Sequence, residues 1–125
     1  MDIFSGLNQQ QREATLATEG PVLILAGAGS GKTKTLTHRI AHLIQKGVKP
    51  DKILAITFTN KAAEEMKKRI SAVLVPETGS QPFIGTFHGL GVFILKNSGR
   101  RLNIPRRFTI LDEEDSLSIF KNCLK

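Results

Sequence analysis

The 125-residue sequence contains a single cysteine, Cys123, and neither tryptophan nor tyrosine. One thiol cannot form an internal disulfide, so a reducing compartment suits the chain. No apolar run approaches the roughly 20 residues of a membrane-spanning helix, and the N-terminus lacks the basic and then apolar segments of a secretion signal. We therefore expect a cytoplasmic protein with no membrane partner.

Acidic residues are also in short supply. The chain has 18 Lys and Arg against 11 Asp and Glu, which gives a formal net charge of +7. This excess favours a polyanionic partner, although a solvated basic face has the same composition. The length fits one modest domain that can bury a core, and it is short for a complete triphosphatase.

The most informative segment is the glycine-rich run AGAGSGKT at residues 26–33, which directly follows the apolar stretch 21–25. Glycines at 27, 29 and 31 let successive backbone N–H groups curl around phosphate oxygens. Lys32 can then reach the β- and γ-phosphates, and the Thr33 hydroxyl can bind Mg²⁺. The residues predicted to cradle a nucleoside triphosphate are Ala26, Gly27, Ala28, Gly29, Ser30, Gly31, Lys32 and Thr33. An ordinary flexible loop would not explain why GKT closes the run.

The remaining pattern alternates strands with helices. We expect strands at 21–25, 52–58 and 83–87, and helices at 9–18, 32–46, 60–74 and 88–96. The segment 108–111 and a helix that starts at 112 are expected to begin a further part that the chain does not complete. Loops are expected at 76–82 and in the basic connector 97–107, and Asn8 and Asn60 are the predicted N-caps. The predicted buried faces are Leu36, Ile40, Leu43 and Ile44 on one helix, and Ala63, Met66, Ile70, Val73 and Leu74 on the next. This order predicts an α/β fold with a mainly parallel sheet.

Four segments, in this order, resemble one family. They are Leu7-Asn8-x-x-Gln11-x-x-Ala14, the GSGKT loop, the ITFTNKAA run at 56–63 and the GTFH run at 85–88. Over essentially its whole length the chain resembles the N-terminal part of UvrD/Rep/PcrA-type superfamily 1 DNA helicases. The resemblance implies a RecA-like P-loop NTPase fold that is incomplete: the first RecA-like domain over 1–108, and the start of an inserted helical subdomain over 109–125.

The resemblance also assigns a nucleotide site for ATP and Mg²⁺, with Lys32 and Thr33 as its catalytic residues. Gln11 would read the adenine edge, because an amide offers both a donor and an acceptor. Without the family spacing, Gln11 is equally an exposed helical glutamine. Lys34 stands where the family commonly has an arginine that packs on the base, and it lacks the planar guanidinium.

By the same resemblance, single-stranded DNA would bind where the second and third strands end. The predicted contacts are Thr57, Phe58, Thr59, Asn60 and Lys61, followed by Thr86, Phe87 and His88. The alternative is that Phe58 belongs to the core and Asn60 is only a helix cap. Gly89 replaces the serine more usual in the family.

Two further patterns have ordinary interpretations. His38 and His42 have the i,i+4 spacing of a metal-binding helix, but Arg39 stands where a zinc protease needs glutamate, and no third ligand is evident. We interpret them as surface or cleft residues. Asp112 and Glu113 follow a short apolar run like an acidic Mg²⁺ motif, but a helix N-terminus explains them better.

Complete enzymes of this family hydrolyse ATP to move along single-stranded DNA from 3′ to 5′ and open the duplex, also at single-strand/double-strand junctions. Their acidic motif and transition-state arginines are expected beyond Lys125, so the present chain should bind ATP better than it hydrolyses it. We expect a monomer, and a role in repair or in replication is left open. The alternatives are a self-contained, kinase-like P-loop enzyme and a non-catalytic module that binds nucleotide or nucleic acid.

Overall fold

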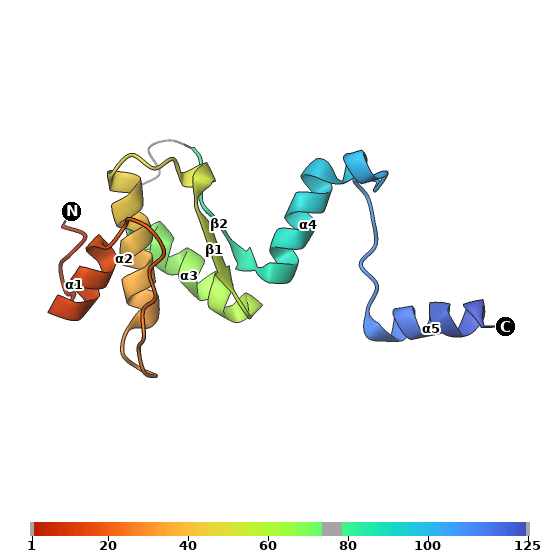
Figure 1. The fold of residues 1–125 in the computed structure, drawn as a ribbon, viewed down its shortest axis with the longest axis horizontal. Helices are drawn as coiled ribbons and strands as arrows, with labels where there is room; N and C mark the ends of the chain where they lie inside the picture. Colours follow the sequence, from red (N-terminus) through yellow and green to blue (C-terminus); the bar gives the residue numbers. More distant parts are fainter. Residues whose placement is uncertain (1, 74–78, 125) are drawn as a thin grey trace. The chain divides into compact units, whose positions relative to one another are not determined.

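A computed structural model describes residues 2–73 and 79–124, and the chain divides into two compact units, Met1–Phe87 and His88–Lys125. Figure 1 shows the order of the elements along the chain. The first unit holds α1 (Gln9–Leu16), α2 (Lys32–Gln45), the short 3-10 helix η1 (Pro50–Lys52), β1 (Leu54–Thr57), α3 (Asn60–Val73) and β2 (Phe83–Thr86). Next come α4 (Phe87–Ser98), the 3-10 helix η2 (Gly99–Leu102) and α5 (Glu113–Cys123).

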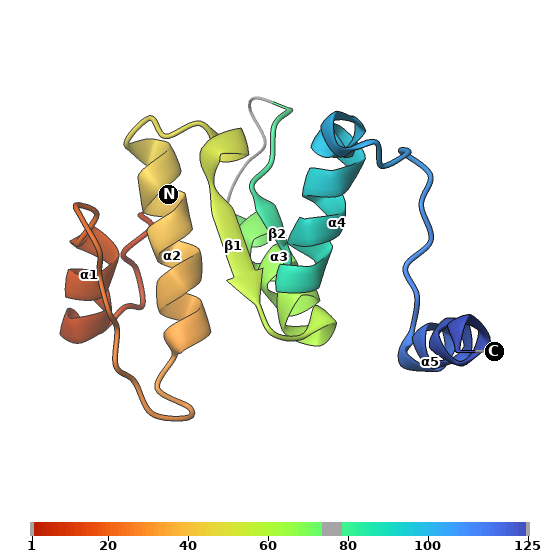
Figure 2. The same cartoon turned by 45° about the vertical axis from the view of Figure 1, so that its right-hand side comes forward.

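The sheet of the first unit consists of β1 and β2, which run parallel (Figure 2). Leu54 pairs with Phe83 at one end and Thr57 with Thr86 at the other. The predicted parallel pairing is thus confirmed, with α3 as the intervening helix. Both strands end at the same edge, so the residues that follow Thr57 and Thr86 are neighbours in space.

The predicted strand at 21–25 is wrong. In the described residues the sheet contains only β1 and β2, and the segments 21–25 and 108–111 are irregular. Leu23 and Leu25 are 82% and 86% exposed, and Ile110 is 66% exposed. An apolar run becomes a strand only where a neighbouring strand takes up its backbone hydrogen bonds, and in this part of the structure neither segment has such a neighbour.

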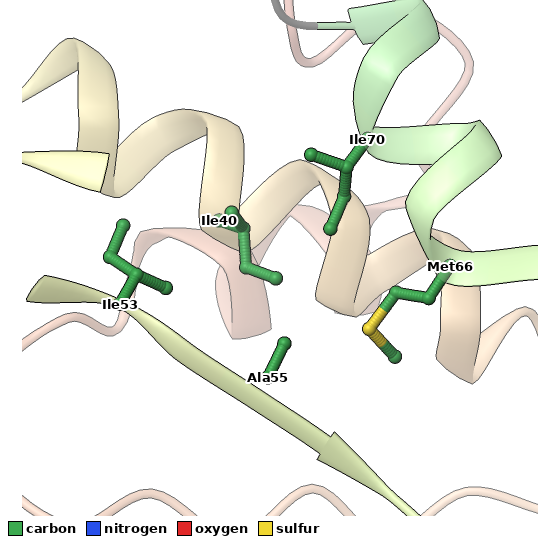
Figure 3. Packing of buried hydrophobic residues seen from close by; sticks show 5 residues of the cluster. All are labelled: Ile40, Ile53, Ala55, Met66 and Ile70. Carbon is green, nitrogen blue, oxygen red and sulfur yellow. The ribbon is translucent and has the colours of Figure 1, made fainter. Parts of the chain in front are cut away.

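The core lies between α2, α3 and β1. Ile40, Ile53, Ala55, Met66 and Ile70 pack together there (Figure 3), and Leu43, Ile44 and Ile84 lie against them. The predicted stripe of α2 is therefore correct except for Leu36, which is 41% exposed. This core fixes the positions of α2 and β1 relative to each other.

The helix ends follow local sequence signals. Asn8 forms the predicted cap of α1: its Oδ1 accepts from the Gln11 backbone N–H at 2.8 Å, and its own N–H donates to Gln11 Oε1 at 3.1 Å. Asp112 caps α5 by accepting from the Asp115 N–H at 2.8 Å, as the helix-terminus interpretation predicts. Leu74 and residues 76–78 of the predicted loop lie outside the described residues.

The second unit contains α5, most of α4, and the basic connector between them. A tight turn shapes the connector, in which the Ile104 N–H donates to the Gly99 carbonyl oxygen at 3.0 Å and Asn103 takes φ +59°. Its arginines, Arg100, Arg101, Arg106 and Arg107, are exposed. No helix in the part of the chain that the structure describes is long and apolar enough to cross a membrane.

Candidate nucleotide site and nucleic-acid interface

The glycine-rich run closes on itself and leads directly into α2. Within it, the Ser30 N–H and Oγ both donate to the Gly27 carbonyl oxygen, at 3.3 and 2.6 Å. Gly29 and Gly31 have φ values of +74° and +83°, a conformation that strains residues with a Cβ. Gly31 is the N-cap of α2 and accepts from the Thr35 N–H at 2.9 Å. The backbone of the loop therefore lies next to the N-terminus of α2. Backbone N–H groups at a helix N-terminus are the donors that an anion site requires.

Lys32 and Thr33 are the first two residues of α2. The Lys32 ammonium reaches back over the loop and donates to the Ala26 carbonyl oxygen at 3.0 Å. Lys32 is exposed and Thr33 is half-buried. The positive end of the helix dipole and the lysine charge thus act at the same place, which favours an anionic group there.

Gln11 is joined to this loop. Its Nε2 donates to the Ser30 carbonyl oxygen at 3.0 Å, while its Oε1 accepts from the N-cap residue Asn8. A Cβ built on Gly31 would lie 2.6 Å from the same Nε2. The amide is therefore packed between α1 and the phosphate loop, unlike a glutamine that is free in solvent.

A hollow of about 270 Å³ lies between α1 and the loop. It is lined by Asn8, Gln10, Gln11, Ala14, Ile24, Leu25, Ala26, Gly27, Ser30, Lys32 and Thr35. Residues predicted to contact the base and residues predicted to contact the phosphates thus share one concave site.

Lys34 has a contact that sequence reasoning missed. Its ammonium donates to the Gly6 carbonyl oxygen at 2.5 Å, in the turn that precedes α1. The two residues are far apart in the sequence, and no short motif connects them. The available signal was the repeat of Lys34, His38 and His42 at intervals of four on one helix.

The two histidines face the same N-terminal turn. The His38 Nδ1 hydrogen-bonds with the Ile3 carbonyl oxygen, and the His42 ring lies edge-on to the Phe4 ring with centroids 5.4 Å apart. Burial, followed by the nearby Lys46 and Arg39, lowers the pKa of His42. Among residues 2–73 and 79–124, no group of three or more His, Cys, Asp or Glu side chains is placed to hold a metal ion.

The edge where β1 and β2 end carries a pair of exposed aromatic rings. Phe58 is 91% exposed and Phe87 is 58% exposed, and their ring centroids lie 5.7 Å apart. The alternative that Phe58 belongs to the core is therefore wrong. The two ring planes are tilted by 49° to each other, and each exposed ring offers a face of the kind on which an unstacked base can stack.

Polar residues follow Phe58 in the chain and begin α3. Thr59 caps the helix, because its Oγ1 accepts from the Ala62 N–H at 3.1 Å, and its carbonyl oxygen accepts from Thr57 Oγ1 at 2.9 Å. The prediction of Asn60 as the cap is wrong by one residue, since a threonine precedes it and satisfies the same N–H group. Asn60 and Lys61 are exposed on the first turn. His88 is exposed and begins the second unit.

Comparison with known proteins gives a consistent result. A sequence model of the UvrD/REP helicase N-terminal domain matches residues 7–125. The ATP-dependent DNA helicase PcrA of Bacillus subtilis is 53% identical over 124 residues, which is 98% of this chain and 17% of that protein. The PcrA proteins of Leuconostoc citreum and Staphylococcus epidermidis are 50% and 52% identical over 98% of the chain. The chain spans 16–17% of the length of these relatives.

Proposed function

Because this chain belongs to the UvrD/REP helicase family, whose N-terminal domain it matches over residues 7–125, we propose that it forms the ATP-binding, single-stranded-DNA-contacting N-terminal part of a 3′-to-5′ ATP-dependent DNA helicase. The observation that carries the proposal is the contact between Gln11 and the phosphate loop. It links the base side and the phosphate side of one hollow. The parallel β1–α3–β2 arrangement is compatible with part of a RecA-like P-loop domain.

The residues of the loop have the chemistry that Mg-ATP requires. Backbone N–H groups of residues 27–33, the start of α2 and the Lys32 ammonium supply positive charge and donors for phosphate oxygens. The Thr33 hydroxyl is a hard oxygen ligand of the kind that Mg²⁺ prefers. Gln11 is the proposed reader of adenine. Lys34 stands where the family commonly has an arginine that packs on the base, and its ammonium donates to the Gly6 carbonyl oxygen. Mg²⁺ would supply charge neutralisation between the phosphates, and these residues would hold and orient the nucleotide.

For DNA, the support comes from the edge where β1 and β2 end. Phe58 and Phe87 offer stacking surface, and the Thr59 hydroxyl with the first turn of α3 offers phosphate donors. Asn60 and Lys61 extend the same proposed track, and Thr57, Thr86 and His88 stay proposed contacts by the family resemblance alone. The relatives are named DNA helicases, which makes DNA the expected polyanion for the +7 charge.

The proposal separates binding from hydrolysis. Asp112, the best candidate for an acidic metal ligand, has its carboxylate engaged in capping α5. Rapid phosphoryl transfer needs groups that orient water and neutralise charge in the transition state. The chain by itself is therefore proposed to bind Mg-ATP and to hydrolyse it very slowly.

Titration calorimetry with Mg-ATP tests the binding step. Lys32→Ala removes the cation of the loop and is expected to weaken binding by roughly 2–3 kcal/mol, the scale of charge-assisted hydrogen bonds. Lys52→Ala, at the end of η1, is the matched control and should bind like the wild type. Equal affinities for Lys32→Ala and the wild type would contradict the assignment of the loop.

An ATPase assay with and without single-stranded DNA tests the second half of the proposal. Little turnover is expected from the 125-residue chain under either condition. A rate that DNA raises strongly and that disappears in Lys32→Ala would show that Asp112 and Glu113 form a working acidic motif, and would overturn the separation.

A further inference from the structure

Three side chains on one face of α2 hold the N-terminal segment. Lys34, His38 and His42 are spaced at i, i+4 and i+8, so they lie in a row along the helix. Lys34 donates to the Gly6 carbonyl oxygen at 2.5 Å, His38 hydrogen-bonds with the carbonyl oxygen of Ile3, and His42 packs against the ring of Phe4. We call this row the N-terminal clamp.

The clamped segment has a defined structure of its own. The Ser5 N–H donates to the Asp2 carbonyl oxygen at 3.1 Å, and the Leu7 N–H donates to that of Phe4 at 3.2 Å. Ile3 is only 5% exposed. Gly6 has φ +75°, and a Cβ there would lie 3.2 Å from the Lys34 ammonium. The turn thus presents its carbonyl oxygens directly to α2.

This turn leads straight into the helix that carries Gln11. Gly6 lies two positions before Asn8, whose capping box includes the Gln11 side chain. Arg12, the next residue of α1, lies over the Phe4 ring at 5.1 Å. The clamp therefore acts on the same few residues that orient the Gln11 amide.

The helix α1 depends on such outside contacts. It has eight residues, fewer than the roughly 12–15 that an isolated helix needs for stability in water. Its one buried residue is Thr15. Its C-terminal half is also held by α2, since Arg39 donates to the Ala14 carbonyl oxygen at 2.7 Å. Contacts with α2, at both ends, therefore determine where Gln11 lies relative to the phosphate loop.

We propose that the N-terminal clamp, with Lys34 as its main member, is a positioning device that sets how much the base contributes to nucleotide binding. Lys34 acts on adenine indirectly. Its ammonium donates to the Gly6 carbonyl oxygen and so holds the turn, and the turn positions Gln11. The proposal rests on the proposed ATP site and adds residues that touch neither the phosphates nor the base.

Binding of Mg-ATP and of Mg-tripolyphosphate, measured by calorimetry, separates positioning from direct contact. Lys34→Met keeps an unbranched side chain, one atom shorter, and removes its donor. We expect about a 3- to 10-fold loss of ATP affinity, the scale of one hydrogen bond, and no change for tripolyphosphate, which has no base. Lys34→Arg keeps a donor and should restore ATP binding. Lys49→Met, an exposed lysine before η1, is the matched control and should leave both affinities unchanged.

A second variant tests whether the effect passes through the turn. Phe4→Ala removes the partner of His42 and Arg12, and we expect the same loss for ATP alone. In the double variant Lys34→Met/Phe4→Ala the two losses of ATP affinity should not add, because both changes release the same turn. A thermal melt of each variant confirms that it is folded.

The outcomes are distinct. If the wild-type chain binds neither ligand, the proposed function fails. If it binds both, the clamp is overturned when Lys34→Met weakens tripolyphosphate as much as ATP. It is also overturned when Phe4→Ala binds ATP like the wild type, since Lys34 would then touch the nucleotide directly.

Discussion

Gly31 and Gln11 fit together so closely that a Cβ on the glycine would lie 2.6 Å from the Nε2 of the glutamine. Gly31 also has φ +83° and is the N-cap residue of α2. Backbone conformation and side-chain contact thus both require glycine at this position. The contact joins two motifs that are 20 positions apart in the sequence.

Gly31→Ala should therefore lower both stability and nucleotide affinity. A left-handed backbone costs an alanine about 1–2 kcal/mol, and the displaced Gln11 adds to this. Urea denaturation should show the loss, whereas Gly27→Ala should be close to wild type in stability, because a Cβ there meets nothing within 4 Å. Equal stability of the two variants would show that the loop accommodates a methyl group at 31.

Gln11→Glu tests the amide without removing the cap. A carboxylate can still accept from the Asn8 N–H, but it cannot donate to the Ser30 carbonyl oxygen and is repelled by it. We expect ATP affinity to fall by at least ~5-fold and GTP affinity to change much less. Gln45→Glu, on the last residue of α2, makes the same charge change away from the loop. Equal losses for ATP and GTP in Gln11→Glu would mean that the residue has only a structural role.

Single-stranded DNA binding should depend on Phe58 and Lys61 in different ways. Because Phe58 is 91% exposed, Phe58→Ala should leave the fold intact and weaken binding by about 1–3 kcal/mol with an unchanged salt slope. Lys61→Ala should weaken binding and flatten the slope. Fluorescence anisotropy with a short oligo-dT across a salt series measures both.

Two controls match these variants. Phe120→Ala removes another exposed ring, 61% exposed, from α5 and should have no effect. Arg106→Ala removes a charge from the connector and should have less effect than Lys61→Ala. The proposed DNA track would be contradicted if removing an exposed arginine lowered DNA affinity as much as Lys61→Ala does, and if Phe58→Ala bound DNA like the wild type. Nonspecific charge attraction would then explain the binding.

The clamp should make stability depend on pH through His42. Its pKa is lowered from 6.5 by burial and by the neighbouring cations Lys46 and Arg39, so the unfolded chain takes up a proton at a higher pH than the folded chain. Stability is then fully present above about pH 6.5 and falls as the pH drops towards the folded pKa. Arg12, which lies over Phe4, is a further cation near the ring.

Urea denaturation between about pH 7.5 and 5 should show this decline. His42→Gln should flatten the profile, while His88→Gln, in the second unit, serves as the control. A wild-type profile that rises on acidification would mean that a different group dominates.

Local sequence patterns predicted the parts of the fold that local physics determines. The caps at Asn8 and Asp112 and the strands at 54–57 and 83–86 depend on side-chain chemistry and alternation within a few residues. Of the three glycines from which the phosphate loop was predicted, Gly29 and Gly31 have positive φ values, and phosphate binding by this loop stays a prediction. ATP, Mg²⁺ and DNA contacts stay predictions, as does a domain boundary near residue 108.

What the sequence did not predict depends on partners that are distant in the chain. The segment 21–25 has the composition of a strand, but strand formation requires a neighbour, and composition cannot supply one. The contact between Lys34 and Gly6 spans 28 positions and involves a backbone carbonyl oxygen, which carries no sequence signature. The N-cap of α3 is a local feature that was also mispredicted. Thr59 and Asn60 are adjacent and both suit a cap, and only the backbone geometry selects Thr59.

The double engagement of Gln11 has a thermodynamic consequence for recognition. A side-chain amide has two N–H donors and two lone pairs on its oxygen, and the bonds to Ser30 and Asn8 use one of each. One N–H and one lone pair are left, with the orientation of the amide already determined. A freely rotating glutamine would lose up to about 2 kcal/mol of rotamer entropy when it bound a base. Here that loss of entropy occurs during folding, so adenine would meet an amide that is already oriented. Less of the free energy of its hydrogen bonds would then be offset by ordering the side chain.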